Sequence, residues 1–504
     1  MRLLPQGAAV AKRRLLLVAL DAMEITWLRR LTAQGRLPNL AAFFAGVHEL
    51  PVRSDGAVVG GSVWPTFASG KGPGYHGRYW WLQWVPEEMR FVRSSHPAFD
   101  YRPFWLGLAE AGKRVVVIDA PYVPLARHPL VQQISGWGTQ DEVAPESWPD
   151  DALPQLRRAW GAHPLSLDTV EPHSPRDLLR MAEKLSKGVA MRARLLEQLA
   201  GDRQCDLVVV LFGETHKAGH YLAEEREVVA GKTNFDLIAE VLQPLDEAWP
   251  RVLAAAGEGT TVALFALHGM QHQVDYSVLG RQVLAIALGR DPASALPRPD
   301  LLRRVRDLVP DPVHRFVWER LPPGIRAARQ GALDGRGAHP GADPVFPVGH
   351  DADFAARVSI AGREAEGVVN REDADAWLAR LEEAALPFRS PEGLPVFSGL
   401  LRIAERFPGP RADYLPDGLL VSNRELARVL EATDPAGRRI VNPMQERRNG
   451  IHTGRGFCFI RPAAGVPLQP AGEVDARDFA PTSYALLGLA PPGGFEGRAF
   501  APVV

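Results

Sequence analysis

Histidine pairs spaced four residues apart are the features of this sequence that most directly suggest chemistry. His216 and His220 form one pair, and His268 and His272 form another. Side chains at this spacing share one face of a helical turn, so their imidazoles can bind one metal ion. His452 precedes the last apolar run and could add a third nitrogen to the site begun by the first pair. Such pairs also arise by chance, and a surface position is the simpler explanation for His272.

A hydroxyl-bearing segment near residue 60 could supply a nucleophile. The segment reads GGSVWPTFASG, and its proline, Pro65, suits the first turn of a helix. A hydroxyl just before that helix would lie at the positive end of the helix dipole, where backbone N–H groups can hold a phosphate. Metal contact would also lower the pKa of that hydroxyl. Ser62 is the first candidate and Thr66 the second, and the simpler alternative is that Ser62 only caps the helix.

Short apolar runs predict the strands that would position these groups. The runs are Leu15–Leu20, Arg114–Ile118, Asp206–Phe212 and Thr260–Ala266, and a helical stretch from about Thr233 to Ala256 separates the last two. Continuous apolar runs are typical of buried parallel strands, and their alternation with helices predicts an α/β fold with a mostly parallel, doubly wound sheet.

Polar residues follow several of these runs, at the edge of the sheet where such folds bind ligands. They are Asp21, Glu214, His216, His220, His268 and His272. A carboxylate such as Asp21 is a good ligand for a divalent cation, although a strand-end Asp more often caps a helix. The coincidence of these positions is the first functional signal in the chain.

The rest of the chain predicts one large domain over residues 1–504, with two less regular regions. Residues about 85–200 are rich in Trp, Pro and Arg and suggest an insertion, whereas residues about 285–400 contain many Pro and Gly and suggest a cap-like insertion. Apolar runs return at Gly418–Val421 and Phe457–Ile460, so we expect residues 401–504 to close the core.

Composition excludes several classes of partner. The 58 basic and 59 acidic residues give a net charge of -1, so no overall basic field exists to bind nucleic acid. Cys205 and Cys458 adjoin apolar runs and are expected to be buried, and two cysteines cannot build a cysteine-rich zinc module. We see no apolar stretch long enough to span a membrane and no signal-peptide pattern, so we expect a cytoplasmic location.

Six segments, taken in order, resemble the type I phosphodiesterase/nucleotide pyrophosphatase family of the alkaline phosphatase superfamily. They are LLLVALDAM with GRLPNLAAFFAGV, SVWPTFASGKGPGYHG, FGETHKAGH, ALHGM, RVSIAGREAEGVV and HTGRG. The resemblance implies an alkaline-phosphatase-like fold with inserted cap regions. It also implies two divalent metal ions, commonly zinc, with manganese as an alternative, that are bridged by the substrate phosphate.

The resemblance also implies roles for individual residues. One metal ion would bind Asp21, Ser62 and His268. The other would bind His216, His220 and His452. Attack by the Ser62 hydroxyl, or by that of Thr66, would give a phospho-enzyme that water then hydrolyses.

Two departures from the family pattern reduce the negative charge of the expected site. Leu267 and His216 stand where family members usually carry Asp, so the site is less negative by up to two charges. This change favours a borderline ion such as zinc over a harder cation. Three further side chains could assist as auxiliary groups: Glu214, His272 and Asp275.

The expected function is hydrolysis of a small-molecule phosphodiester. A phosphomonoesterase or a sulfatase-like hydrolase on the same fold is an alternative, although neither cysteine begins the Cys-x-Pro-x-Arg pattern of sulfatases. A catalytically impaired relative that binds a phosphorylated ligand is the alternative from another class, and Leu267 is its best support.

Overall fold

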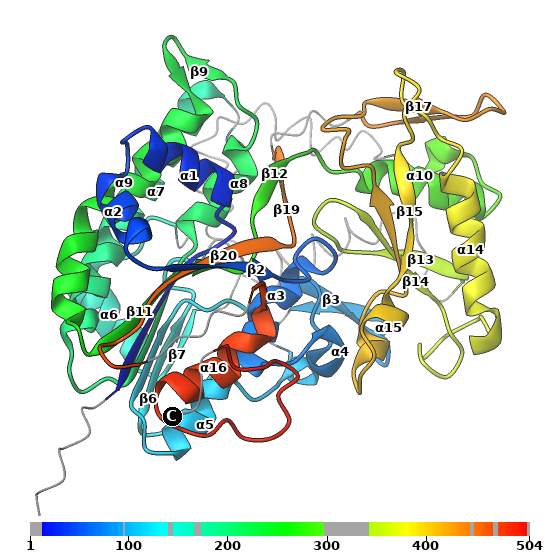
Figure 1. The fold of residues 1–504 in the computed structure, drawn as a ribbon. Helices are drawn as coiled ribbons and strands as arrows, with labels where there is room; N and C mark the ends of the chain where they lie inside the picture. Colours follow the sequence, from blue (N-terminus) through cyan, green and yellow to red (C-terminus); the bar gives the residue numbers. More distant parts are fainter. Residues whose placement is uncertain are drawn as a thin grey trace, which may run out of the picture.

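A nine-stranded sheet forms the centre of the larger lobe of the protein, on the left in Figure 1. The computed structural model describes residues 13–93, 96–139, 145–165, 172, 174–296, 342–443, 448–466 and 472–500. In spatial order, the strands are β21 (Val474–Asp475), β2 (His48–Arg53), β20 (Arg455–Arg461), β11 (Thr260–Ala266), β1 (Arg14–Leu20), β8 (Leu207–Phe212), β5 (Val115–Ile118), β6 (Val131–Ser135) and β7 (Glu146–Trp148).

Most neighbouring strands in this sheet run parallel. β1 is parallel to both β11 and β8, and β5 is parallel to both β8 and β6. β20 is antiparallel to β11 and β2, and β7 is antiparallel to β6. The predicted α/β fold with a mostly parallel central sheet is therefore confirmed.

Helices cover both faces of the sheet because its strands are apolar on both sides. In β1, Leu16, Val18 and Leu20 pack on one face, and the alternate residues pack on the other. The first face is covered by α1 (Ile25–Ala33), α2 (Pro38–Ala45), α6 (Ala152–Trp160), α7 (Pro175–Gly201) and α9 (Asn234–Ala256). The second is covered by α3 (Val63–Ser69), α5 (Phe104–Glu110) and α16 (Phe479–Leu486).

A smaller lobe, on the right in Figure 1, has its own sheet and core. Its four antiparallel strands, in the order β13-β14-β16-β15, are β13 (Val345–Val348), β14 (Phe354–Val358), β16 (Gly418–Ser422) and β15 (Phe397–Arg402). Two helices, α10 (Ser277–Ala287) and α14 (Ala374–Ala385), pack on them. Much of the predicted cap-like region lies here, and its residues 297–341 lie outside the described residues.

The region about 85–200, predicted as an insertion, also contributes β5, β6 and β7 to the central sheet and α7 to its cover. Of these three strands, only β5 consists of a continuous apolar run. β6 carries two glutamines, and β7 is only three residues long. The boundaries of the two predicted insertions stay predictions.

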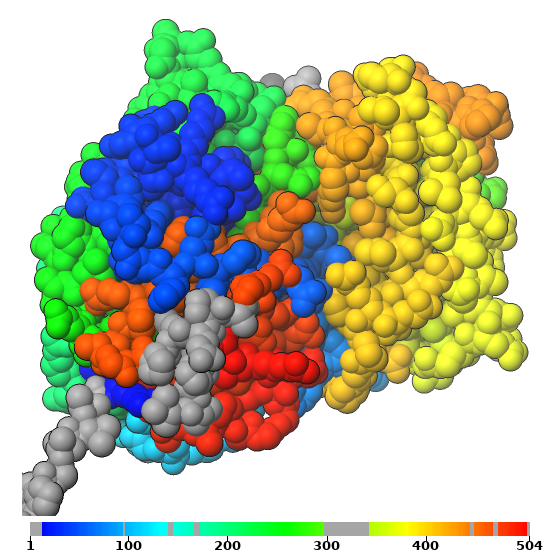
Figure 2. Space-filling view, in the orientation of Figure 1, coloured from blue at the N-terminus to red at the C-terminus, as the bar shows by residue number. Residues whose placement is uncertain are grey.

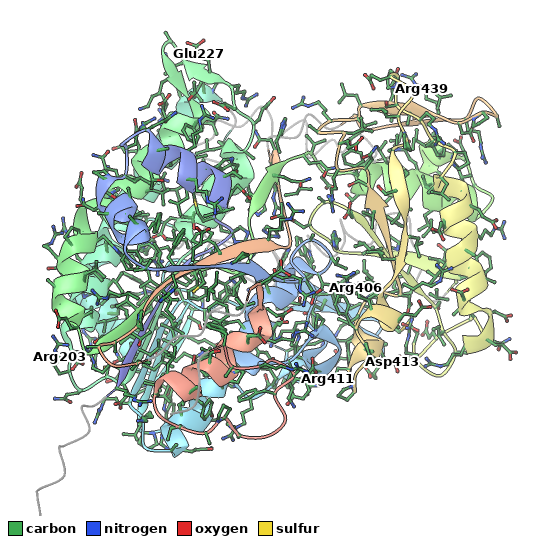
Figure 3. The ribbon with its side chains drawn as sticks, in the orientation of Figure 1. Arg203, Glu227, Arg406, Arg411, Asp413 and Arg439 are labelled. Atoms are coloured by element: carbon green, nitrogen blue, oxygen red, sulfur yellow. The ribbon has the colours of Figure 1, made fainter. Side chains whose placement is uncertain are left out.

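Polar contacts attach the smaller lobe to the larger one. Arg406 ends α15 (Ile403–Arg406) and forms an ion pair with Asp55 at 3.4 Å. Arg411 donates a hydrogen bond to the carbonyl of Asp100 at 2.6 Å. Figure 3 labels Arg406 and Arg411 where the two lobes meet, which places these contacts at the junction.

Chain segments from opposite ends lie side by side in the larger lobe. The pairing of β2 with β20 brings residues near 50 next to residues near 460, and Figure 2 shows these blue and orange segments in contact.

Cys205 and Cys458 are both buried, as expected. In the described parts of the chain, no helix has the length and apolar character needed to cross a bilayer.

Candidate metal centre and nucleophile

Three adjacent parallel strands, β11, β1 and β8, end beside the candidate site. His268 follows β11 by one residue, Asp21 follows β1 directly, and α8 (Glu214–Leu222) begins just after β8. The backbone N–H of Asp21 donates to the carbonyl of Phe212 at 3.1 Å, which holds two of these strand ends together. The carboxyl edge of the sheet thus gathers groups from distant parts of the sequence.

Three buried imidazoles, here called the histidine cluster, meet at this edge. His216 and His220 lie on α8, and His452 ends β19 (Gly450–His452). One ligand nitrogen from each lies within 4.8 Å of the other two, which is close enough to bind one ion. Pairing of β19 with β12 (Met270–His272) places His452 opposite Met270 and so brings it to the strand ends.

Each imidazole of the cluster has an oxygen beside the ring nitrogen that faces away from the centre. His216 Nδ1 lies 2.9 Å from Asp21 Oδ2, and His220 Nδ1 lies 2.8 Å from the carbonyl of Gly450. His452 Nδ1 lies 3.2 Å from Asp351 Oδ2, at an angle outside hydrogen-bond geometry. In His216 and His220, the oxygen beside Nδ1 leaves Nε2 as the nitrogen that carries the lone pair.

Burial keeps three of the imidazoles at this edge of the sheet neutral at neutral pH. It lowers the pKa values of His220 and His452 well below the usual value, and it lowers the pKa of His268 to about 4. Burial alone would raise the pKa of Asp21, but the charge and hydrogen bond of His216 outweigh it and lower this pKa to about 2. Neutral imidazoles beside an ionised carboxylate are the protonation states that metal binding requires.

The donor set fits a borderline divalent cation. His216 Nε2 and His452 Nε2 lie only 2.8 Å apart. Two lone pairs at that distance repel unless a cation or a proton lies between them. Three imidazole nitrogens are a common ligand set for zinc. The metal-ligand roles of these three residues stay predictions.

Ser62 lies beside the cluster with its hydroxyl unsatisfied. The adjoining residues fix its place, since Trp64 Nε1 donates to Asp21 Oδ1 at 2.9 Å, and Gly60 lies against the ring of His452. Ser62 is fully buried, its Oγ has no hydrogen-bond partner among the described residues, and its side chain does not cap α3. Buried hydroxyls are nearly always hydrogen-bonded, so this one is a candidate to meet a ligand.

Thr66, the alternative nucleophile, is already engaged within the protein. Its Oγ1 lies 3.2 Å from Nε2 of His76, which is itself fully buried. Among the described residues, the hydroxyl of Thr66 therefore has a partner and that of Ser62 has none.

His268 lies next to the cluster with both ring nitrogens unsatisfied. Its ring centroid lies 4.6 Å from that of His452 and 6.1 Å from that of His216. Both nitrogens are buried without a hydrogen-bond partner among the described residues. Like the hydroxyl of Ser62, the ring nitrogens of His268 are therefore free to contact a bound ligand.

Glu214, predicted as an auxiliary carboxylate, does not join the histidine cluster. It lies 2.9 Å from Nε2 of His163 and 3.2 Å from Nε of Arg192, all of them buried. Residues two apart on a helix point roughly 200° apart, so Glu214 and His216 cannot share one face of α8.

The other two auxiliary candidates are not brought into the cluster either. Asp275 accepts hydrogen bonds from the backbone N–H and the hydroxyl of Ser277 at the start of α10. His272 ends β12 and is only partly buried.

Asp351 and Arg448 are site residues that the sequence did not predict. Arg448 Nη2 lies 2.6 Å from His220 Nε2 and 2.5 Å from Asp351 Oδ1. Asp351 closely follows β13, so the strand-end criterion could have found it. Arg448 lies in a loop that has no such signal.

Substituting Gly60 tests the position of His452. The Cβ of Gly60→Ala would lie 2.8 Å from His452 Nδ1, closer than side-chain carbons normally approach, so the ring must shift. We expect metal affinity to fall roughly 10-fold or more, as when groups that orient a ligand are disturbed. Competition with a chromophoric chelator measures the change.

Gly259→Ala is the matched control, because nothing lies within 4 Å of its added Cβ. Equal affinities in the two variants would contradict the predicted role of His452.

The fold and the site together define a phosphoric ester hydrolase. A family model described as type I phosphodiesterase / nucleotide pyrophosphatase matches residues 15–288, more than half of the 504-residue chain. The chain belongs to this family, within the alkaline phosphatase superfamily. The match includes every predicted site residue except His452.

Solved structures share the fold at low sequence identity. Phosphonoacetate hydrolase from Sinorhizobium meliloti, in complex with phosphonoformate, has a TM-score of 0.52 and 14% identity over 94% of this chain and 96% of that chain. Inactive murine ectonucleotide pyrophosphatase/phosphodiesterase 5, in complex with AMP, has a TM-score of 0.52 and 12% identity over 97% of each chain. No curated protein sequence matches the chain.

Proposed function

We propose that the protein hydrolyses small-molecule phosphodiesters, with Ser62 as the nucleophile. The observation that carries this proposal is a fully buried serine hydroxyl, next to three converging imidazoles, that has no hydrogen-bond partner in the described part of the chain. Attack by Ser62 Oγ on phosphorus would form an Oγ–P bond and break the bond to one alcohol, and loss of the hydroxyl proton would be balanced by protonation of the leaving alkoxide. Water would then cleave the serine-linked phosphodiester, restore the Ser62 hydroxyl and release the phosphate monoester.

The side chains around Ser62 suit this chemistry. A divalent ion, with zinc as our first choice and manganese as the second, would stabilise the charge that develops on the phosphoryl oxygens. His216, His220 and His452 would hold that ion, and Asp21 would orient His216 through their 2.9 Å contact. Neutral His268 can donate a hydrogen bond to a phosphoryl oxygen, because its nitrogens have no other partner among the described residues.

Removal of metal tests the proposal directly. We expect dialysis against a chelator to abolish turnover of bis-p-nitrophenyl phosphate, and added Zn²⁺ or Mn²⁺ to restore it. We also expect the diester to be hydrolysed faster than p-nitrophenyl phosphate. Release of p-nitrophenol, followed by absorbance, measures both.

Two outcomes would favour the alternatives. Faster turnover of the monoester would indicate a phosphomonoesterase. Binding of phosphate without turnover, in protein that retains metal, would indicate a phospho-ligand-binding relative. The cytoplasmic location stays a prediction.

A further inference from the structure

The loop that leads into Ser62, residues 54–61, is here called the Ser62 loop. It begins directly after β2, and its own backbone hydrogen bonds place the serine. Val58 and Val59 both donate their N–H groups to the carbonyl of Asp55, at 2.9 and 2.8 Å. Ser62 in turn donates its N–H to the carbonyl of Val59 at 2.9 Å. The position of Ser62 therefore depends on the contacts that hold the two valines.

His350 of the smaller lobe contacts this loop directly. It lies in the turn at residues 349–353, between β13 and β14, and its Nε2 lies 2.8 Å from the carbonyl oxygen of Val58. Its Nδ1 accepts hydrogen bonds from the backbone N–H groups of Ala352 and Asp353, at 3.4 and 3.1 Å. A ring nitrogen that accepts carries no proton, so Nε2 carries it and donates to the carbonyl of Val58. The hydrogen bond thus runs from the smaller lobe to the Ser62 loop.

The turn that carries His350 is fixed within the smaller lobe. The carbonyl of Ala352 accepts from the backbone N–H of Tyr276, at the start of α10, at 2.8 Å. The carboxylate of Asp353 accepts from the backbone N–H and the hydroxyl of Ser422, which ends β16, at 2.9 and 2.6 Å. Asp353 and Ser422 are both buried. Because the turn is anchored on both sides, its hydrogen bond can hold the Ser62 loop in one position.

Apolar packing joins the same two parts of the protein. Val58 and Val59 are buried in a hydrophobic cluster with Phe346 of β13, the strand that leads into the turn. His350 binds the carbonyl of the peptide bond that links the two valines. Together with the ion pair at Asp55, these contacts attach the Ser62 loop to the smaller lobe along most of its length.

We propose that His350 is a positioning residue, through which the smaller lobe holds the Ser62 hydroxyl in place for attack on phosphorus. The inference rests on the function proposed above. It gives the smaller lobe a part in the reaction, although neither candidate nucleophile comes from that lobe. A nucleophile displaced by about 1 Å can cost roughly 100-fold in rate, so a hydrogen bond that fixes the loop can control turnover.

Two amide variants of His350 separate its contact with Val58 from the turn itself. His350→Asn keeps an oxygen near the position of Nδ1, which can accept from the N–H groups of the turn, but its amide is too short to reach Val58. His350→Gln is longer by one methylene and places an N–H donor near the position of Nε2.

Steady-state kinetics of the full-length protein with added Zn²⁺ measure the effect of the two variants. We expect kcat for bis-p-nitrophenyl phosphate to fall roughly 10- to 100-fold in His350→Asn, because the nucleophile is misplaced. KM should be nearly unchanged, because the contact does not bind substrate. His350→Gln is expected to recover most of the lost kcat. Equal losses in the two variants would overturn the inference, because the donor at Nε2 would then not matter.

His128→Asn is the matched control in the larger lobe. Its Nδ1 also accepts from the backbone N–H two residues further along, that of Leu130, at 3.2 Å, and its side chain is likewise partly buried. His128 precedes β6 and therefore lies at the opposite edge of the parallel sheet from the candidate site. We expect His128→Asn to match the unmodified protein in kcat and KM.

Hydrogen exchange tests the hold on the Ser62 loop without reference to turnover. Mass spectrometry follows deuterium uptake by peptides that cover residues 54–62. We expect uptake to become several-fold faster in His350→Asn, since the loop opens more often, and to stay slow in His350→Gln and His128→Asn. Uptake that stays slow in His350→Asn would contradict the inference whatever the turnover. Circular dichroism checks that each variant is folded.

The outcomes also separate this inference from the proposed nucleophile. If the nucleophile were misassigned, Ser62→Ala would retain turnover, but exchange in the Ser62 loop would still respond to His350→Asn. Turnover that is lost in Ser62→Ala and unchanged in His350→Asn would leave the nucleophile in place and refute the role of His350.

Discussion

Ser62→Ala is expected to lower kcat/KM for bis-p-nitrophenyl phosphate by roughly 10³-fold or more, the scale of losses on removing a catalytic nucleophile. The hydroxyl is fully buried and makes no hydrogen bond to any residue that the structure describes, so its removal leaves none of these residues without a partner. Stability and zinc content should therefore change little. Steady-state kinetics, thermal unfolding and metal analysis of the same preparation measure the three quantities.

Two hydroxyls in α3 give matched comparisons. Ser69→Ala removes a buried hydroxyl that donates to the carbonyl of Pro65 at 2.7 Å, away from the histidine cluster, and should leave kcat/KM nearly unchanged. Thr66→Ala breaks the 3.2 Å contact with His76 and should affect stability more than turnover. Loss of turnover in Thr66→Ala, with Ser62→Ala still active, would show that the nucleophile is misassigned.

Arg192→Met is expected to destabilise the protein by about 3–5 kcal/mol, the usual cost of leaving buried charges unpaired. Arg192 is fully buried and lies 2.8 Å from Asp119 Oδ2 and 3.2 Å from Glu214 Oε1. Methionine keeps most of the volume of the side chain and removes its charge. Both carboxylates would then lack their guanidinium partner. Urea unfolding followed by tryptophan fluorescence measures the change in the free energy of unfolding.

The loss should depend on pH in a defined direction. Burial alone would raise the pKa of Glu214, but Arg192 and His163 outweigh it and hold this pKa below its usual value. The stabilisation is therefore complete above the unfolded-state pKa of roughly 4.3 and is lost as pH falls through the folded-state pKa. The difference between Arg192→Met and the unmodified protein should shrink in acid.

Lys187→Met is the control for this prediction on the same helix. Lys187 pairs with Glu183 at 2.7 Å, but both side chains are about two-thirds exposed, at 67% and 65%. Exposed pairs contribute roughly 0–1 kcal/mol, so the substitution should be nearly neutral. Equal destabilisation in the two variants would contradict a special role for the buried network.

The strands that carry the site were predictable because each is buried on both faces. β11 matches the predicted Thr260–Ala266, and β1 and β8 differ from their predicted ranges by one residue. Continuous apolar runs of this kind are the clearest local signal for central parallel strands. β7 is an edge strand and β6 lies next to it, and neither has such a run, so the sequence did not reveal them.

Parts of the site depend on contacts that no local pattern encodes. The gathering of His452 with α8 requires the pairing of β12 with β19, and neither strand exceeds three residues. The hydrogen bond from Trp64 to Asp21 joins side chains 43 positions apart. The orientation of Glu214, in contrast, could have been predicted from the sequence, because helical geometry alone separates Glu214 from His216.

The short ribbon of β12 and β19 also bears on when the centre can form. Its last ligand, His452, lies 232 positions beyond His220 in the chain, so the complete donor set exists only once nearly all of the polypeptide has folded. An ion bound there would favour the finished structure over every partly folded one. Pairing of β12 with β19 therefore completes the set of metal-binding side chains, and metal uptake would report completion of folding.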